Sequence, residues 1–245
     1  MSVQIRRFED AAGVARAAAD AGLSIIAEAI AQRGVAHVVL TGGTVGIATL
    51  AAIADNPRHT DIDFEKVHFW WGDERFVEAD SADRNALQAE NALLGKLKLD
   101  RMKVHAFPSS EEFGGNLDQA AEAFAAELAA VAEKQQLLPR FDLVYLGMGP
   151  DGHVASLFPG KPAPAAGLTV TAEHDSPKPP PQRLSLTFEA LNSADRVWFV
   201  VAGADKASAA AEALANTGST LPAARVKGAS ETIWFIDAAA ATEIG

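Results

Sequence analysis

An aspartate and a histidine flank a single glycine within the stretch from 143 to 160. The stretch opens with four apolar residues, 143–146, which predict a buried strand, and then carries glycines at positions 147, 149 and 152. Glycine lets a ligand approach the main chain closely, and a histidine can take up and return a proton near neutral pH. We therefore expect His153 and Asp151 to be catalytic and Gly152 to line the substrate site. The alternative is a plain strand-to-helix turn whose histidine lies on the surface.

A second glycine turn, Thr41-Gly42-Gly43-Thr44, lies between a β-branched run at 36–40 and an apolar helical segment at 47–54. Free N–H groups and the helix dipole converge where a helix begins, so such a turn suits an anion, above all a phosphate. We expect Gly42, Gly43 and Thr44 to bind an anionic group. A tight turn without any ligand is the other interpretation of these residues.

Charged side chains follow or open several other predicted elements. An Asp-Glu-Arg triplet follows a buried strand, an arginine opens an alternating segment, and a lysine stands at the start of an alanine-rich helix. Arginine presents a forked cation that suits phosphate and carboxylate, and a lysine at a helix start opposes the helix dipole. The alternative is that all of them are solvated surface charges. We predict that four of these side chains contact the substrate: Asp73, Arg75, Arg183 and Lys206.

Strands and helices alternate along the whole chain, which predicts one doubly wound α/β domain over residues 1–245 with a mostly parallel sheet. In such a sheet ligands bind at the carboxyl ends of the strands, where the polar loops described above would meet. Asp10 and Asn85 are expected helix N-caps. The expected helices span 8–33, 47–54, 116–136, 188–192 and 207–214, with an alanine-rich helix closing the chain, and the expected strands span 36–40, 67–71, 103–107, 143–146, 168–171, 183–187, 197–201 and 232–236.

Several common motifs are absent from the sequence. Neither glycine turn continues into the dinucleotide-binding fingerprint, and there is no Walker lysine and no nucleophile elbow. The chain has no cysteine, which excludes disulfides, thiolate metal sites and cysteine nucleophiles. The histidines at 37, 59, 68, 105 and 174 show no paired ligand spacing, so we expect them to be structural and expect no metal.

The overall charge argues against large anionic partners. The formal net charge is −11 and no run of lysine and arginine exists, which argues against nucleic acid and anionic membranes. No apolar run approaches the roughly 18 residues of a membrane span, and the first residues lack the apolar core of a signal peptide. We expect a cytoplasmic protein that acts on a small molecule, as a monomer without an obligate protein partner.

Segments from the whole chain, taken together, form a known pattern. They are Leu40–Thr44, Asp73–Arg75 with Asn85 downstream, Leu146–Gly160, Arg183–Thr187, Gly203–Ala207 and, more faintly, Leu221–Ala224. In order and spacing they resemble the 6-phosphogluconolactonase family over nearly the whole chain. The third segment, which contains His153, is the most specific of them.

The resemblance implies an activity and a fold. The family hydrolyses 6-phospho-D-glucono-1,5-lactone to 6-phosphogluconate, the second step of the oxidative pentose phosphate pathway, without a cofactor. Its fold is a Rossmann-like α/β sandwich shared with glucosamine-6-phosphate deaminase and ribose-5-phosphate isomerase. On this interpretation His153 is the general base for water, Asp151 orients the imidazole or holds a sugar hydroxyl, and the glycines and cations bind the phosphorylated substrate.

Two other functions remain open. Glucosamine-6-phosphate deaminase shares the fold and the Asp-Gly-His loop, but it typically has a tyrosine at the position of Arg75 and Ile-Ala-Phe-Asn-Glu-Pro in place of 154–159. Effector domains of sugar-responsive transcription regulators also use a related fold, but they need a DNA-binding segment, which we do not expect in this acidic chain. Ammonia release from glucosamine 6-phosphate, or binding of 6-phosphogluconate without hydrolysis, would favour these alternatives.

Overall fold

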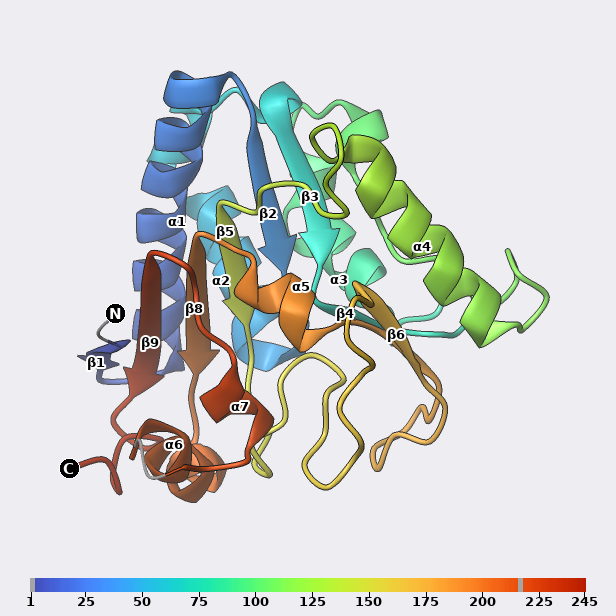
Figure 1. Ribbon diagram of the computed structural model, residues 1–245. Coiled ribbons are helices and arrows are strands. Elements are labelled where there is room, and N and C mark those ends of the chain that lie inside the picture. Colours follow the sequence, from blue (N-terminus) through green and yellow to red (C-terminus); the bar gives the residue numbers. More distant parts are fainter. Residues whose placement is uncertain (1–2, 216–217) are drawn as a thin grey trace.

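A six-stranded sheet forms the centre of the structure, a computed structural model that describes residues 3–215 and 218–245 (Figure 1). The strand order is β1-β9-β8-β5-β2-β3, and every neighbouring pair runs parallel, which confirms the predicted parallel sheet. The strands span Val3–Phe8 (β1), Ala36–Leu40 (β2), Val67–Trp71 (β3), Leu143–Leu146 (β5), Arg196–Val201 (β8) and Glu231–Asp237 (β9).

Helices cover both sides of this sheet (Figure 1). Asp10 is the N-cap of the first helix, as predicted, and its carboxylate accepts a hydrogen bond from Gly13 N at 2.7 Å; Gly34, in the left-handed conformation, is the C-cap. The helices span Ala11–Arg33 (α1), Gly43–Asp55 (α2), Asn85–Ala92 (α3), Leu117–Val131 (α4), Phe188–Asn192 (α5), Ala207–Leu214 (α6) and Pro222–Arg225 (α7).

The central strands are short apolar runs. All residues of β2 and β5, and all but one of β3, are buried. A parallel strand with helices on both faces is apolar throughout rather than alternating, and this is why the sequence predicts these three strands with the bounds that the structure has. Tyr145 in β5 is buried as well, and its hydroxyl donates to the carbonyl of Ala18 in α1 at 3.1 Å.

A second, antiparallel sheet continues from the end of β3. It has the order β4-β7-β6 and consists of Asp73–Arg75 (β4), Arg183–Leu186 (β7) and Val170–Glu173 (β6). Gly72 joins β3 to β4, and its carbonyl accepts a hydrogen bond from Leu186 N at 2.8 Å. The sequence predicts a loop at 73–75, whereas the structure pairs these residues with β7, so their side chains are held at fixed positions of a sheet.

The order of the strands creates a switch point between β2 and β5. These strands pair with each other, but from β2 the chain continues to β3 on one side, whereas from β5 it continues to β8 and β9 on the other. The loops after β2 and β5 therefore leave the sheet in opposite directions and open a crevice at its carboxyl edge. In Figure 1 this is the edge at which the arrowheads of β2, β3, β5, β8 and β9 end.

Three of the histidines that we expect to be structural stack on one another beside Trp70. The ring centroids of His37 and His68 are 4.5 Å apart, and those of His68 and His105 are 5.1 Å apart. His68 Nδ1 lies 2.8 Å from His105 Nε2, and His105 Nδ1 lies 2.6 Å from a carboxylate oxygen of Glu127. Trp70 Nε1 donates to His37 Nδ1 at 3.3 Å. Four of the six ring nitrogens thus contact protein groups, which fits the expected structural role.

Several predicted elements differ from the structure. The helix predicted from residue 8 begins at Ala11, because residues 3–8 pair with β9 as an edge strand. Helix α2 begins at Gly43, four residues earlier than the predicted 47, and helix α4 ends at Val131 rather than at the predicted 136. The predicted strand at 103–107 is reduced to a single bridge between Val104 and Phe69, because a turn of 3-10 helix occupies residues 101–103. The short strand expected at 168–171 lies at 170–173.

Two helix ends also differ. Asn85 is the first residue of α3 and Arg84 takes the capping position. The alanine-rich end of the chain forms turns instead of the predicted helix. There the carboxylate of Asp237 accepts a hydrogen bond from Ala240 N at 2.8 Å, a contact that stabilises a turn directly after β9.

Candidate active site

One cavity of about 590 Å³ lies at the carboxyl ends of β2, β5 and β8. It contains the loops that sequence patterns single out, although these loops are far apart in the chain. Asp151 and Gly152 lie outside its lining. Eight of the ten predicted site residues line it: Gly42, Gly43, Thr44, Asp73, Arg75, His153, Arg183 and Lys206.

His153 enters the cavity from the loop after β5. Its Nδ1 lies 2.5 Å from Asp151 Oδ1, and its ring packs over Gly149, where an added Cβ would lie 2.0 Å from the ring. A carboxylate can only accept, so Nδ1 carries the hydrogen and Nε2 is left as the basic nitrogen. Burial lowers the pKa of His153, and Asp151 opposes this shift. The histidine is therefore suited to act as an unprotonated base at neutral pH.

Asp151 and Gly152 support the histidine from behind. Gly152 has a φ of 78°, and its carbonyl accepts a hydrogen bond from Ala223 N at 3.0 Å. A Cβ at this position would lie 2.8 Å from Leu221, so close packing against that residue also requires glycine. Burial raises the pKa of Asp151, but the hydrogen bond with His153 and the charge of Lys178 outweigh it and lower the pKa overall. The aspartate is thus an anion in hydrogen-bond contact with Nδ1 of the imidazole.

The glycine turn after β2 leads directly into α2. Gly42 is the N-cap, without a side-chain cap, and Gly43 has a φ of 77°. The first amides of any helix lack partners within the helix, and here the first residues of the helix line the cavity. A Cβ on Gly42 would lie 1.9 Å from Asn85 Oδ1, so only glycine fits this close approach. The turn has the features of an anion-binding helix terminus.

Asp73 joins three segments of the cavity wall. It is only 8% exposed, and its carboxylate accepts a hydrogen bond from Ser156 Oγ at 2.7 Å. Its carbonyl accepts one from the side-chain amide of Asn85 at 2.9 Å. Within the described residues, Asn85 Oδ1 is buried without a partner. Asp73 therefore fixes the positions of the loop after β5 and the start of α3.

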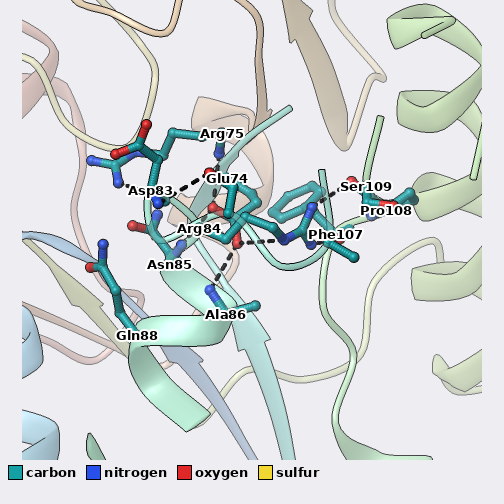
Figure 2. Close-up of polar contacts among 12 residues, drawn as sticks. Glu74, Arg75, Asp83, Arg84, Asn85, Ala86, Gln88, Phe107, Pro108 and Ser109 are labelled. Atoms are coloured by element: carbon teal, nitrogen blue, oxygen red, sulfur yellow. Dashed lines mark hydrogen bonds and ion pairs between the residues drawn. The ribbon is translucent and has the colours of Figure 1, made fainter. Parts of the chain in front are cut away.

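Glu74, next to it in β4, is buried, does not line the cavity, and holds the start of α3 (Figure 2). Its carboxylate accepts hydrogen bonds from the backbone N–H groups of Arg75, Asn85 and Ala86 at 2.7–2.8 Å. Burial raises the pKa of Glu74, whereas the charge of Arg84 at 3.9 Å and the three amides lower it. This network fixes the backbone that carries Arg75 and Asn85.

The three predicted cations line the cavity, but they differ in how many hydrogen bonds hold each side chain to the protein. Arg75 donates from Nη1 to the carbonyl of Asp83 at 2.5 Å, and its buried Nε has no partner within the described residues. Lys206 lies 2.7 Å from a carboxylate oxygen of Asp205. Arg183 is held on the protein, because its Nε and Nη2 donate to the carbonyls of residues 178, 179 and 180 at 2.9–3.1 Å.

The structure adds lining residues that sequence reasoning missed. Lys178 comes from the proline-rich stretch 161–181, in which we predicted no site residue, and it lies beside His153. Asn85 was considered as a helix cap and, like Asp205, as part of the family pattern, but neither was predicted to be a site residue, and Asp237 was not considered. Their position in the cavity follows from the fold, and no local pattern in the sequence indicates it.

Within residues 3–215 and 218–245 there is no group of three or more histidine, aspartate or glutamate side chains that could hold a metal ion. In the same part of the chain, no helix is long and apolar enough to cross a membrane. The expectation that the site needs no metal or cofactor stays a prediction.

Comparisons with known proteins agree with this architecture. A family model described as glucosamine-6-phosphate isomerases/6-phosphogluconolactonase matches residues 9–234. A 6-phosphogluconolactonase of Streptomyces coelicolor is 45% identical over 236 residues, which cover 94% of this chain and 90% of the relative. A 6-phosphogluconolactonase of Mycobacterium tuberculosis is 41% identical over 247 residues, which cover 100% and 99%.

A solved structure is similar over the same length. The crystal structure of 6-phosphogluconolactonase from Thermotoga maritima has a TM-score of 0.82 and 28% identity, and the match covers 96% of this chain and 100% of that one. These matches confirm the resemblance found in the sequence and the Rossmann-like α/β fold expected from it. The chain belongs to the family of glucosamine-6-phosphate isomerases and 6-phosphogluconolactonases.

Proposed function

We propose that the protein hydrolyses 6-phospho-D-glucono-1,5-lactone to 6-phosphogluconate, the second step of the oxidative pentose phosphate pathway. Relatives at 41% and 45% identity over nearly the whole chain carry the name of this enzyme. The observation that carries the proposal is that His153 and the amino end of α2 line one cavity. A base and an anion site in the same cavity suit a substrate that has an ester at one end and a phosphate at the other.

His153 is the base in this proposal. Its Nε2 takes a proton from a water molecule whose oxygen attacks C1 of the lactone. The bond between C1 and the ring oxygen then breaks, and the imidazolium returns its proton to that oxygen. General acid–base catalysis of this kind contributes roughly 10²–10⁴-fold to the rate. The short contact with Asp151 supports this role because it directs the hydrogen to Nδ1 and leaves Nε2 basic.

The phosphate is bound at the other end of the cavity. The free amides at the start of α2 and the hydroxyl of Thr44 suit its oxygens. Arg75 and Lys206 line the same cavity and supply charge. These local cations let a protein of net charge −11 accept a dianion.

The oxyanion that forms at C1 also needs donors. Backbone amides of the glycine loop are natural candidates for this role, but three of them already have partners. Gly147 N donates to Thr41 Oγ1 at 3.2 Å, Gly149 N donates to the carbonyl of His153 at 3.0 Å, and Gly152 N donates to the carbonyl of Gly149 at 2.9 Å. The proposal therefore assigns no oxyanion donor to these three glycines.

A coupled assay tests the proposed function. Freshly made phospholactone is supplied, and 6-phosphogluconate is followed through its dehydrogenase, with spontaneous hydrolysis subtracted. Acceleration that is proportional to the amount of enzyme supports the proposal. Ammonia release from glucosamine 6-phosphate without lactone hydrolysis would assign the deaminase activity instead, and binding of 6-phosphogluconate without turnover would indicate a sensor.

Monomeric state and cytoplasmic location also stay predictions. The family relationship is compatible with both and determines neither. Size-exclusion chromatography with light scattering measures the first, and a mass of two or more chains contradicts it. Fractionation of the source cells measures the second.

A further inference from the structure

Lys178 lies directly beside the proposed catalytic pair. Its Nζ is 3.3 Å from His153 Nδ1 and 3.4 Å from Asp151 Oδ1. Because His153 Nδ1 carries a hydrogen and an ammonium has no acceptor, the favourable contact of Lys178 is the one with Asp151. One carboxylate oxygen thus faces two donors, the imidazole and the ammonium. The lysine lies on the Nδ1 side of the ring, whereas the basic nitrogen is Nε2.

The main chain that carries Lys178 is held at several points. Arg183 donates to the carbonyls of residues 178 and 179 from Nη2 and to that of Pro180 from Nε. Ser176 Oγ donates to the carbonyl of Lys178 at 2.9 Å and accepts a hydrogen bond from Lys178 N at 3.2 Å. Arg183 itself is only 6% exposed and belongs to β7. A sheet residue therefore sets the place of the lysine.

The charges around His153 come from three elements. Asp151 belongs to its own loop, Lys178 to the segment before β7, and Asp73 to β4. The two aspartates favour the protonated imidazole, whereas Lys178 disfavours it. Asp205, from the 3-10 turn at Ala204–Lys206, faces Lys178 as a further negative charge. Without Lys178 only burial would oppose the effect of the two aspartates on the histidine.

We propose that the positive charge of Lys178 offsets the negative charge of Asp151, so that His153 stays unprotonated near neutral pH. Arg183 supports this arrangement because it holds residues 178–180 in place. This inference rests on the proposed function, because it assigns His153 the part of a base. Lys178 and Arg183 are then positioning residues that act through the histidine. Lactone turnover needs a base that is free of its proton when the substrate arrives, and a neighbouring cation secures this state.

The experiment compares four proteins. The kcat/KM for the phosphorylated lactone is measured from about pH 5 to 8 in the wild type, in Lys178→Met, in Lys178→Arg and in the control Lys227→Met. Lys227 is exposed and does not line the cavity. The ring titration of His153 is followed by NMR in the same proteins, and far-UV circular dichroism verifies that each is folded.

Lys178→Met is expected to lose at least about threefold in kcat/KM at pH 5.5 relative to the wild type, and to match it near pH 8. Its His153 titrates at higher pH, Lys178→Arg restores the wild-type profile, and Lys227→Met does not differ. An unchanged titration of His153 in Lys178→Met overturns the inference. So does a loss that is equal at every pH and confined to KM for the phosphorylated lactone, because Lys178 would then bind phosphate.

Arg183 is tested by a double-mutant cycle. Arg183→Gln is expected to reproduce the acid-side loss of Lys178→Met, and the double variant is expected to lose no more than either single one, since both changes remove the same interaction. Additive losses would show that Arg183 acts on the substrate directly. A wild-type protein without lactonase activity contradicts the proposed function alone, whereas the NMR titration of His153 still decides whether Lys178 controls it.

Discussion

At the level of single residues, the two nitrogens of His153 have different surroundings. Nδ1 faces Asp151 and Lys178, whereas Nε2 has no hydrogen-bond partner among the described residues. An Nε2 without a protein partner on the wall of the cavity can take a proton from a bound molecule. The histidines of the stack beside Trp70 differ in their place, since none of them lines the cavity.

The pH dependence of activity follows from the surroundings of His153. Burial lowers its pKa below the ordinary value of 6.5, and the base is active only without its proton. The acid limb of the activity is therefore centred below pH 6.5, and activity falls as the pH drops through the lowered pKa of the folded enzyme. A profile of kcat/KM against pH measures this limb. An acid limb centred above pH 6.5 would contradict the assignment.

Substitution of Arg75 or Lys206 tests the phosphate end of the cavity. Arg75→Met and Lys206→Met are each expected to raise KM for the phosphorylated lactone about tenfold, because a hydrogen bond to a charged group contributes about 1.5–3 kcal/mol. Glucono-1,5-lactone, which lacks the phosphate, is the control substrate and should show little change. An equal increase in KM for both substrates would mean that these cations do not bind the phosphate.

At the level of elements, the two faces of β4 have different roles. Asp73 and Arg75 face the cavity, whereas Glu74 between them turns inward and binds the start of α3 (Figure 2). Alternating side chains on the two faces of a strand make this possible. A loop with the same three residues would not separate the structural carboxylate from the functional side chains.

The buried hydrogen bonds of Glu74 predict that removal of its side chain causes a large loss of stability. Glu74→Ala leaves three backbone amides without an acceptor and leaves Arg84 buried beside an empty site, which costs roughly 3 kcal/mol or more of unfolding free energy. Glu74→Gln, which keeps an acceptor of the same shape, is the matched control and should lose less. Urea unfolding followed by circular dichroism measures both. A loss below about 1 kcal/mol in Glu74→Ala would show that the network adds little.

Local sequence patterns predicted the elements that depend on local chemistry. The strands 36–40, 67–71 and 143–146 agree with the structure because continuous apolar runs between glycine turns have one reasonable interpretation. The loop at 73–75 and the strand at 103–107 were wrong, because pairing with β7 and the turn at 101–103 depend on the rest of the fold. Lys178 could not be found for the same reason. Its contact with His153 joins residues 25 positions apart.

At the level of the whole molecule, the parallel sheet separates two histidine environments. His153 lies at the carboxyl edge, whereas His37 and His68 belong to β2 and β3 themselves. Burial, together with the charges of His68, His105 and Arg33, lowers the pKa of His37 to about 3. Burial and the charge of His105 lower the pKa of His68 to about 4. Between about pH 4 and 6.5 the folded protein therefore keeps both rings neutral, whereas the unfolded chain protonates them.

This difference predicts how stability depends on pH. Below about pH 6.5 the unfolded chain takes up protons that the folded protein refuses, so stability is lost as the pH falls from 6.5 toward the folded pKa. For His37 alone the loss between pH 7 and pH 5 is about 2 kcal/mol. His37→Asn, which keeps an acceptor for Trp70, should lose about that much less over the same range. Urea unfolding at each pH measures the difference, and identical slopes would show that His37 does not contribute.

The most direct test of the central claim is the turnover of His153→Ala on the phosphorylated lactone, measured together with its affinity for 6-phosphogluconate. The account predicts that kcat falls roughly 10²–10⁴-fold while product affinity changes little, because the phosphate end of the cavity is intact. Near-normal turnover in this variant would contradict the account, since another group would then be the base.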